Sequence, residues 1–209
     1  MNNKMIEAQQ LDMIKAEEEK KKNRILWIDI ETTGKKYKKD KILQIAFIIT
    51  DNKNKPLIEK EYIVKHKKNR VFKKAVPYVQ NMHSKTGLWD RLEVEGIDLK
   101  EIDEEISKII RANMYCDNWG LIIGGNSVSF DNHFIEAQMP LLGELLSYRV
   151  MDMSSVLQWF RVYGNKVDTS KNRVKPHDAL DDIRNSIAQS EAALNKLEEI
   201  KNKNEGDEK

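Results

Sequence analysis

The chain has 209 residues, of which 40% are hydrophobic and 33% charged, and its formal net charge is +2. This length favours one domain with a sizeable core over two domains. The single cysteine, Cys116, excludes a disulfide framework and a cysteine zinc site and favours a reducing, cytoplasmic setting.

The N-terminal segment, residues 1–23, is mostly polar with a partial apolar stripe, which predicts a helical extension outside the core, a candidate for self-association. It lacks the apolar run of a signal peptide, and the longest apolar runs of the chain are too short to cross a bilayer. Residues 198–209 are charged and asparagine-rich, so we expect a flexible tail there. The predicted domain is therefore 24–197.

Apolar patterning divides this domain into strands followed by alternating strands and helices. Three strands are predicted at Arg24–Ile30, Ile42–Thr50 and Leu57–Lys65, and the turn at 51–56 makes the last two antiparallel neighbours. After them the pattern predicts, in order, a helix over 97–110, a buried strand at 121–123, a helix over 130–139 ending near Pro140, a short strand at 150–151, a helix around 156–160 and a last core helix over 180–194. The expected fold is α/β, a mixed sheet flanked by helices.

Two carboxylates end the first predicted strand. Asp29 and Glu31 are two residues apart, so they point to the same face of the strand, beside apolar Ile28 and Ile30. Two anions in such surroundings repel each other and favour a cation between them. The alternative is a strand end that frays into water and solvates both groups.

Two further acidic signals lie at helix starts. Asp131 follows a predicted strand and opens a helix, where an aspartate can equally serve as a cap. His177 precedes the last helix, whose first turns carry Asp178, Asp181 and Asp182. Capping explains Asp178 well and Asp182 less well, because an acid further along a helix gains little from the helix dipole.

Taken together, these residues resemble the motifs of the DEDDh exonucleases, which have the ribonuclease-H-like fold with a five-stranded mixed sheet. The pattern is Asp29-x-Glu31-Thr32-Thr33-Gly34, then Asp131, then His177 with Asp182 after four intervening residues. Within that superfamily, residues 24–196 are most similar to the oligoribonuclease family. The further matching segments are Leu26-Trp27-Ile28, His83-Ser84-Lys85-Thr86-Gly87-Leu88, Gly125-Asn126-Ser127, Tyr148-Arg149, Asp152-Met153-Ser154 and His177-Asp178-Ala179-Leu180-Asp181-Asp182-Ile183.

The resemblance implies a 3′-to-5′ exoribonuclease that releases 5′-mononucleotides by a two-metal-ion mechanism. Asp29, Glu31, Asp131 and Asp182 would hold two divalent ions, and such hard oxygen ligands suit Mg²⁺ or Mn²⁺. His177 would accept a proton from the attacking water, for which an imidazole is well suited. The implied partner is short single-stranded RNA, and single-stranded DNA is also possible; the family is commonly dimeric, so a homodimer is a candidate state.

The resemblance also implies substrate contacts. Ser127, Arg149 and Ser154 match a cluster that binds the 5′-phosphate end, and arginine suits this role because its planar fork binds phosphate bidentately. Tyr78 stands where the family usually has a tryptophan that stacks on a base, and His83 matches a histidine beside the substrate. From the residues alone, a surface ion pair for Arg149 and simple packing for Tyr78 remain open.

Two departures from the family pattern bear on the substrate. Thr32 replaces the usual methionine, and Lys35 stands where oligoribonucleases carry a leucine wedge between bases. Basic residues cluster at Lys35, Lys36, Lys38, Lys39 and Lys41, and again at Lys65 through Lys68, Arg70, Lys73 and Lys74. Such clusters are either a solvated surface or a phosphate-binding surface. A general single-strand DNA or RNA exonuclease of the proofreading type is therefore an alternative function. A non-catalytic nucleic-acid-binding module is a second alternative, but the presence of all five catalytic residues argues against it.

Overall fold

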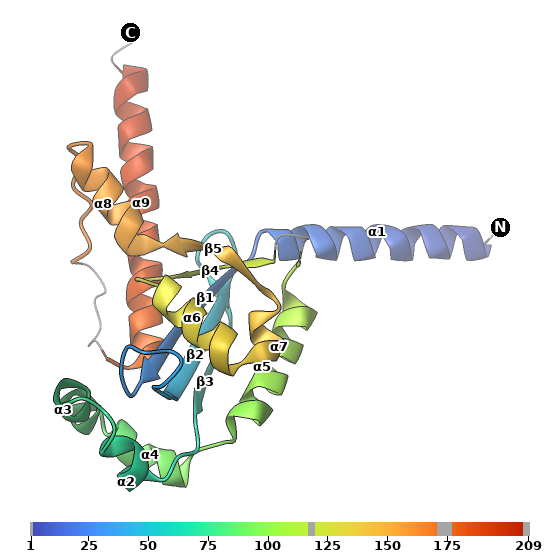
Figure 1. Ribbon diagram of the computed structural model, residues 1–209. Coiled ribbons are helices and arrows are strands. Elements are labelled where there is room, and N and C mark those ends of the chain that lie inside the picture. Colours follow the sequence, from blue (N-terminus) through green and yellow to red (C-terminus); the bar gives the residue numbers. More distant parts are fainter. Residues whose placement is uncertain (1, 117–119, 171–176, 207–209) are drawn as a thin grey trace.

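The computed structural model describes residues 2–116, 120–170 and 177–206 (Figure 1). One five-stranded sheet has the order β3-β2-β1-β4-β5. Its strands are β1 (Ile25–Thr32), β2 (Ile42–Thr50), β3 (Pro56–Ile63), β4 (Leu121–Gly125) and β5 (Leu146–Asp152). The first three are antiparallel neighbours, whereas β4 and β5 run parallel to β1. The predicted mixed α/β sheet is thus confirmed, with β5 longer than expected.

Helices cover both faces and one end of this sheet (Figure 1). They are α1 (Asn2–Lys22), α2 (Lys68–Phe72), α3 (Pro77–Thr86), α4 (Leu88–Val94), α5 (Leu99–Asn113), α6 (Ser129–Gln138), α7 (Pro140–Gly143), α8 (Met153–Val162) and α9 (Ala179–Gly206). The helices predicted from residue 97 onward are confirmed. The sequence analysis did not predict α2, α3 and α4. Helices α2 and α4 have only five and seven residues, and α3 buries only Val79 and His83, so none of them shows a sustained apolar period.

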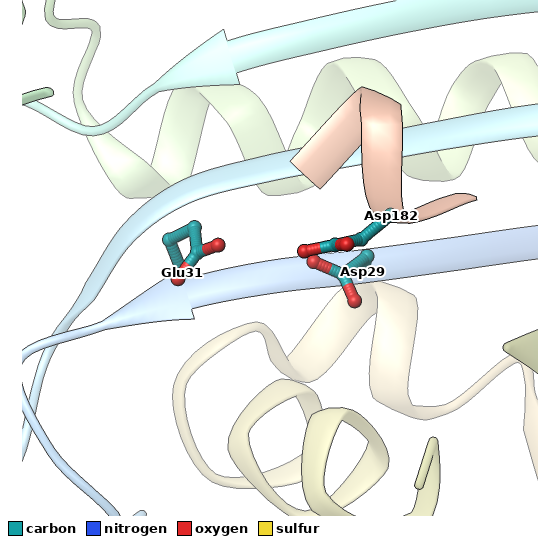
Figure 2. A group of neighbouring side chains, drawn as sticks. All are labelled: Asp29, Glu31 and Asp182. Atoms are coloured by element: carbon teal, nitrogen blue, oxygen red, sulfur yellow. The ribbon is translucent and has the colours of Figure 1, made fainter. Parts of the chain in front are cut away.

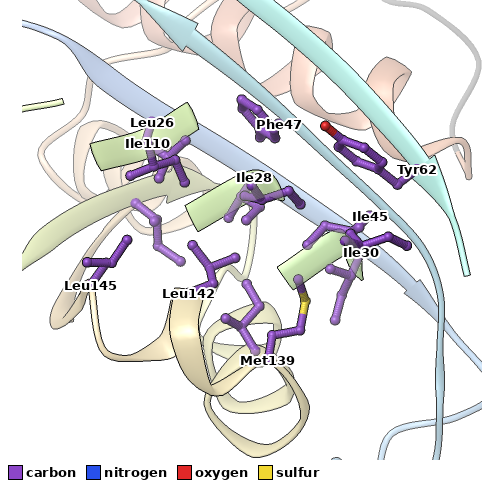
Figure 3. Packing of buried hydrophobic residues seen from close by; sticks show 14 of the residues in the cluster. Leu26, Ile28, Ile30, Ile45, Phe47, Tyr62, Ile110, Met139, Leu142 and Leu145 are labelled. Atoms are coloured by element: carbon purple, nitrogen blue, oxygen red, sulfur yellow. The ribbon is translucent and has the colours of Figure 1, made fainter. Parts of the chain in front are cut away.

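Burial explains why β1 and β2 form the centre of the sheet. All nine residues of β2 are buried, as expected for a strand covered on both faces. Successive side chains of β1 alternate between the faces. Leu26, Ile28 and Ile30 pack with residues of α5, α6 and α7 on one face (Figure 3). Trp27 packs with residues of α8 and α9 on the other. Odd-numbered residues of β1 therefore face α9.

The two ends of the chain are helical. As predicted, the N-terminal segment is a helix, and Figure 1 shows α1 extending away from the sheet. At the other end, where a flexible tail is expected from residue 198, α9 continues as a helix to Gly206, and the flexibility of this segment stays a prediction. Ile200 packs against the core, and Lys196 pairs with Glu199 at 2.9 Å, which support the extra turns. Residues 207–209 lie outside the described residues. Within the described ranges, no helix is both long and apolar enough to span a membrane.

Candidate active site

The site begins at the end of β1, which carries Asp29 and Glu31 on the face turned towards α9. In the register with β2, Asp29 lies opposite Ala46 and Glu31 opposite Gln44. Because β4 and β5 run parallel to β1, all three strands end at the same edge of the sheet. Parallel strands commonly present binding groups at this edge.

Asp182 comes to this pair from the first turn of α9. Ligand oxygens of Asp29, Glu31 and Asp182 all lie within 4.8 Å of one another. Figure 2 shows the carboxylates of Asp29 and Asp182 facing each other, with Glu31 further along the strand. Residues more than 150 positions apart in sequence thus form one compact group of oxygen ligands. A carboxylate group of this kind is suited to a hard divalent cation.

Asp131 lies beside this group, in the first turn of α6. One of its carboxylate oxygens, Oδ1, accepts a hydrogen bond from the backbone N–H of Ile30 at 3.0 Å. This bond fixes the carboxylate of Asp131 against β1 at Ile30, the residue between Asp29 and Glu31. The charge of Asp131 contributes to raising the pKa of both Asp29 and Glu31, so the three groups interact electrostatically. The structure therefore brings all four predicted carboxylates to one place.

All four carboxylates hold protons more tightly than usual. Burial, followed by repulsion from neighbouring carboxylates, raises the pKa of Asp29 well above its ordinary range and that of Glu31 to about 8. Burial also raises the pKa of Asp131 to about 8 and, with hydrogen bonds from His177 and Asn185 opposing it, that of Asp182. A bound cation would oppose both effects, because it stabilises the ionised form of each carboxylate. The residues present therefore fit divalent metal ions.

His177 precedes α9 and is tied to the same cluster. Its backbone N–H donates to Asp182 Oδ2 at 2.9 Å, and its φ of 76° lies in the left-handed region, which is uncommon for residues other than glycine. The side chain lines a pocket of about 570 Å³ between α3 and the start of α9. The exposed ring of Tyr78 lines the same pocket. The predicted base and the predicted stacking residue thus share one cavity.

His83 lies on the inner side of the cluster. Its side chain is fully buried, with Nε2 3.7 Å from Glu31 Oε2 and 3.3 Å from the carbonyl oxygen of Thr32. The ring packs edge-on against Trp89, and burial is the main cause that lowers its pKa, which favours the neutral form. Its contact with the site is through Glu31. The predicted contact with substrate stays a prediction, since the ring has no exposed surface.

Two of the three predicted phosphate contacts, Ser127 and Ser154, lie just beyond the ends of β4 and β5, whereas Arg149 lies in the middle of β5. Gly125 pairs with Asp152, so Ser127 and Ser154, each two residues further on, lie at the same sheet edge. Ser154 donates its hydroxyl to Asp152, which also caps α8. Arg149 is exposed on β5, and its guanidinium lies 4.8 Å from the centre of the Tyr148 ring. Their joint role in binding a phosphate stays a prediction.

Two acidic residues near the site were not predicted to be part of it. The charge of Asp178 raises the pKa of Asp29 and Glu31, and its Oδ2 accepts a hydrogen bond from Gln44 Nε2 at 3.2 Å. The charge of Asp152 raises the pKa of Asp131. The sequence contains a signal for both, because Asp178 adjoins His177 and Asp152 ends a strand parallel to β1. From the sequence, helix capping is a sufficient explanation for Asp178; its position beside the carboxylate cluster is evident only in the structure.

Comparisons with known proteins agree with this arrangement. Residues 26–189 match the family described as Exonuclease (RNase_T). The oligoribonuclease of Corynebacterium glutamicum is 33% identical over 79% of this chain and 75% of its own length. That of Francisella tularensis subsp. novicida is 31% identical over 83% of this chain and 95% of its own length.

Solved structures show the same fold at lower identity. An exonuclease I from Methylocaldum szegediense superposes with a TM-score of 0.60 at 18% identity, over 82% of this chain and 40% of that chain. E. coli exonuclease I in complex with a 5cy-dT13 oligonucleotide gives a TM-score of 0.62 at 15% identity, over 83% and 41%. This chain therefore spans about two fifths of the length of those enzymes. The sheet and its helices are the ribonuclease-H-like fold of exonucleases, and the sequence matches show that the chain belongs to the exonuclease family, among the oligoribonucleases.

Proposed function

We propose that the chain is a 3′-to-5′ exoribonuclease that degrades short oligoribonucleotides to 5′-mononucleotides by a two-metal-ion mechanism. The observation that carries this is the convergence of Asp29, Glu31 and Asp182 within 4.8 Å, with Asp131 fixed against the same strand. Membership of the exonuclease family and the raised pKa values of these carboxylates support a divalent metal requirement. The hard oxygen ligands favour Mg²⁺ or Mn²⁺ over softer ions.

In this mechanism, Asp29, Glu31, Asp131 and Asp182 would hold two divalent ions, which would supply positive charge for a displacement at phosphorus. The chain's own residues then position the reactants. Asp131 is oriented by the backbone of Ile30. Asp182 is oriented by a hydrogen bond from the backbone N–H of His177. The position of the proposed base is therefore linked to that of a proposed metal ligand.

His177 acts as the general base. It lines the pocket between α3 and the start of α9, and its backbone N–H binds the carboxylate of Asp182, so its ring can accept a proton from water held next to the scissile phosphate. Tyr78 lines the same pocket with most of its ring exposed, so a base entering there can stack on it, whatever its identity. Ser127 and Ser154, just beyond the ends of β4 and β5, hold the 5′-phosphate of a short substrate together with Arg149 from within β5.

Polarity of cleavage tests this proposal. The purified chain is supplied with Mn²⁺ and with RNA labelled at either the 5′ or the 3′ end. We expect the 3′ label to leave at once as a mononucleotide and the 5′-labelled strand to shorten in single-nucleotide steps. Release of the 5′ label first, or internal cleavage, would contradict the proposal.

A second function has a specific observation in its favour. Lys35 replaces the apolar wedge of oligoribonucleases, and its loop carries four further lysines. A cationic loop favours contact with a longer backbone, as in a general single-strand exonuclease acting on RNA or DNA. The two functions differ in length preference: kcat/KM falls with length for the first and rises for the second. A binding module without catalysis would have no use for the buried acidic cluster.

A further inference from the structure

A second pocket, of about 370 Å³, lies between the loop that joins β1 to β2 and the segment from the end of β3 through α2. Its lining is dominated by positive charge. The cationic side chains are Lys39, Lys41, Lys65, Lys67, Arg70 and Lys74. Asp40 is the one carboxylate among its lining residues. Members of the two basic clusters, which are separate in sequence, thus line one surface in the fold, the cationic pocket.

The positive charges of the cationic pocket outnumber its one carboxylate. In the ranges that the structure describes, none of its six cations forms an ion pair with a carboxylate, although the neighbouring Lys68 pairs with Asp90. The carboxylate of Asp40 is occupied within its own loop, where Oδ2 accepts a hydrogen bond from the backbone of Lys36 at 2.7 Å. Six cations around one concave surface repel one another and attract a polyanion. The pocket therefore has the electrostatics of a phosphate-binding site.

The loop that supplies Lys39 and Lys41 is held in one conformation. Thr33 and Lys41 exchange hydrogen bonds, each 2.9 Å long, across the base of the loop. Gln138 Nε2 donates to the carbonyl oxygens of Tyr37 and Asp40 at 2.9 and 2.8 Å, which fixes the loop to α6. A Cβ at position 34 would lie only 2.7 Å from Asp40 Oδ2, so a larger residue there would displace the carboxylate that accepts from Lys36. Cations on a fixed backbone bind with less loss of conformational entropy than cations on a mobile one.

The cationic pocket begins next to the catalytic strand. Thr33 lines the pocket and is two residues beyond Glu31, so at most about 7 Å of backbone separates their Cα atoms. We propose that the cationic pocket binds the phosphodiester backbone of single-stranded nucleic acid that extends beyond the nucleotides held at the carboxylates. This assignment rests on the nuclease activity of the proposed function, and it favours the second form of that function, which acts on longer strands. It gives the enzyme affinity that grows with strand length, alongside a cluster at Ser127, Arg149 and Ser154 that serves short substrates.

Binding measured without catalysis tests the assignment. The full chain is kept in chelator, and fluorescence anisotropy gives its affinity for a labelled diribonucleotide and for an RNA of about 12 nucleotides. The test variant is Lys67→Gln with Arg70→Gln, two pocket cations outside the β1–β2 loop. The matched control is Lys53→Gln with Lys55→Gln, which removes the same charge at the other end of the β2–β3 hairpin.

We expect the longer RNA to bind the wild-type chain more tightly than the dinucleotide, with an affinity that falls steeply with salt. For two lost phosphate contacts, the slope of log affinity against log salt falls by about 1.4, and the affinity drops by about 25-fold at about 0.1 M salt. The control variant should retain the wild-type slope. DNA of the same sequence should bind within a few-fold of RNA, because the contacts are to phosphates.

Three results would overturn the assignment: length-independent affinity, an equal loss in the two variants, or equally strong competition by polyglutamate, which is anionic but has no phosphates. Circular dichroism of each variant establishes that it is folded. Dinucleotide hydrolysis by the wild-type chain with Mn²⁺ is measured separately. Length-dependent binding without any hydrolysis would overturn the proposed function and support the pocket, whereas hydrolysis with length-independent binding would do the reverse.

Discussion

Replacing Glu31 with glutamine removes a charge that the metal-free fold accommodates poorly, and we expect it to stabilise the metal-free protein as pH rises. The folded pKa of Glu31 is about 8, against an ordinary value of 4.5. Below pH 4.5 the carboxyl is protonated in both the folded and the unfolded states. Between pH 4.5 and about 8 only the unfolded state releases the proton readily, so the wild-type protein loses stability through this window.

The size of the effect follows from the difference between the two pKa values. At about 1.4 kcal/mol per pH unit, the rise in pKa amounts to about 5 kcal/mol once the group is fully ionised. At about pH 8 the penalty on the folded state is about 4 kcal/mol, and at about pH 5 it is about 1 kcal/mol. Burying the glutamine amide has a cost that does not depend on pH. The free energy of unfolding of Glu31→Gln relative to the wild type should therefore rise by about 3 kcal/mol from about pH 5 to about pH 8, and this rise reports the charge alone.

Urea unfolding in chelator, at about pH 5 and about pH 8, measures this change for the wild type and Glu31→Gln. Glu198→Gln, which removes an exposed carboxylate from α9, is the matched control and should show no such pH dependence. A stability difference for Glu31→Gln that is the same at both pH values would refute the reasoning. It would mean that the carboxylates are solvated in the metal-free protein and are not held against one another by burial.

Three further predictions concern the metals, the base and the phosphate cluster. Metal affinity should rise between about pH 6 and about pH 8, and protons should be released on binding, because the carboxyls with raised pKa must ionise to bind a metal. Calorimetry that shows neither a rise in affinity nor proton release would contradict the raised pKa values. His177→Ala should slow turnover by about 10²–10⁴-fold while leaving metal affinity nearly unchanged, and loss of the metals instead would show that the histidine has another role. Arg149→Ala should abolish the preference for 5′-phosphorylated dinucleotides, at a cost of about 1.5–3 kcal/mol in kcat/KM. The control Arg161→Ala, which removes an exposed arginine of α8, should keep the preference. If the preference survives Arg149→Ala, the general single-strand exonuclease is the better description.

Local sequence signals were sufficient for the sheet and for the strand carboxylates. The continuous apolar run of β2 and the alternation of Asp29 and Glu31 with Ile28 and Ile30 are consequences of backbone geometry, and the structure confirms the resulting strands. In contrast, α2, α3 and α4 show no sustained apolar period, and their position depends on a third cluster around Leu43 and Trp89 that only the fold assembles. The length of α9 likewise depends on the tertiary contact of Ile200.

The approach of distant residues was predictable only through the resemblance. Nothing in the local sequence places Asp182 within 4.8 Å of Asp29, because that proximity depends on how α9 crosses the sheet. The burial of His83 behind Glu31 was equally invisible, since the ring reaches its place by packing on Trp89. The merging of two basic clusters into one pocket required the hairpin of β2 and β3 to bring the β1–β2 loop and the segment after β3 to the same end of the sheet.

The central claim is a metal-dependent hydrolysis performed by the carboxylate cluster, and hydrolysis of a 5′-phosphorylated diribonucleotide tests it most directly. Products are separated for the wild type with Mn²⁺, for the wild type after exhaustive chelation, and for Asp29→Ala, whose fold is checked by circular dichroism. We predict 5′-mononucleotides from the first sample, none after chelation, recovery on addition of Mg²⁺ or Mn²⁺, and nearly none from a folded Asp29→Ala. Robust cleavage by the chelated protein or by that variant would contradict the account.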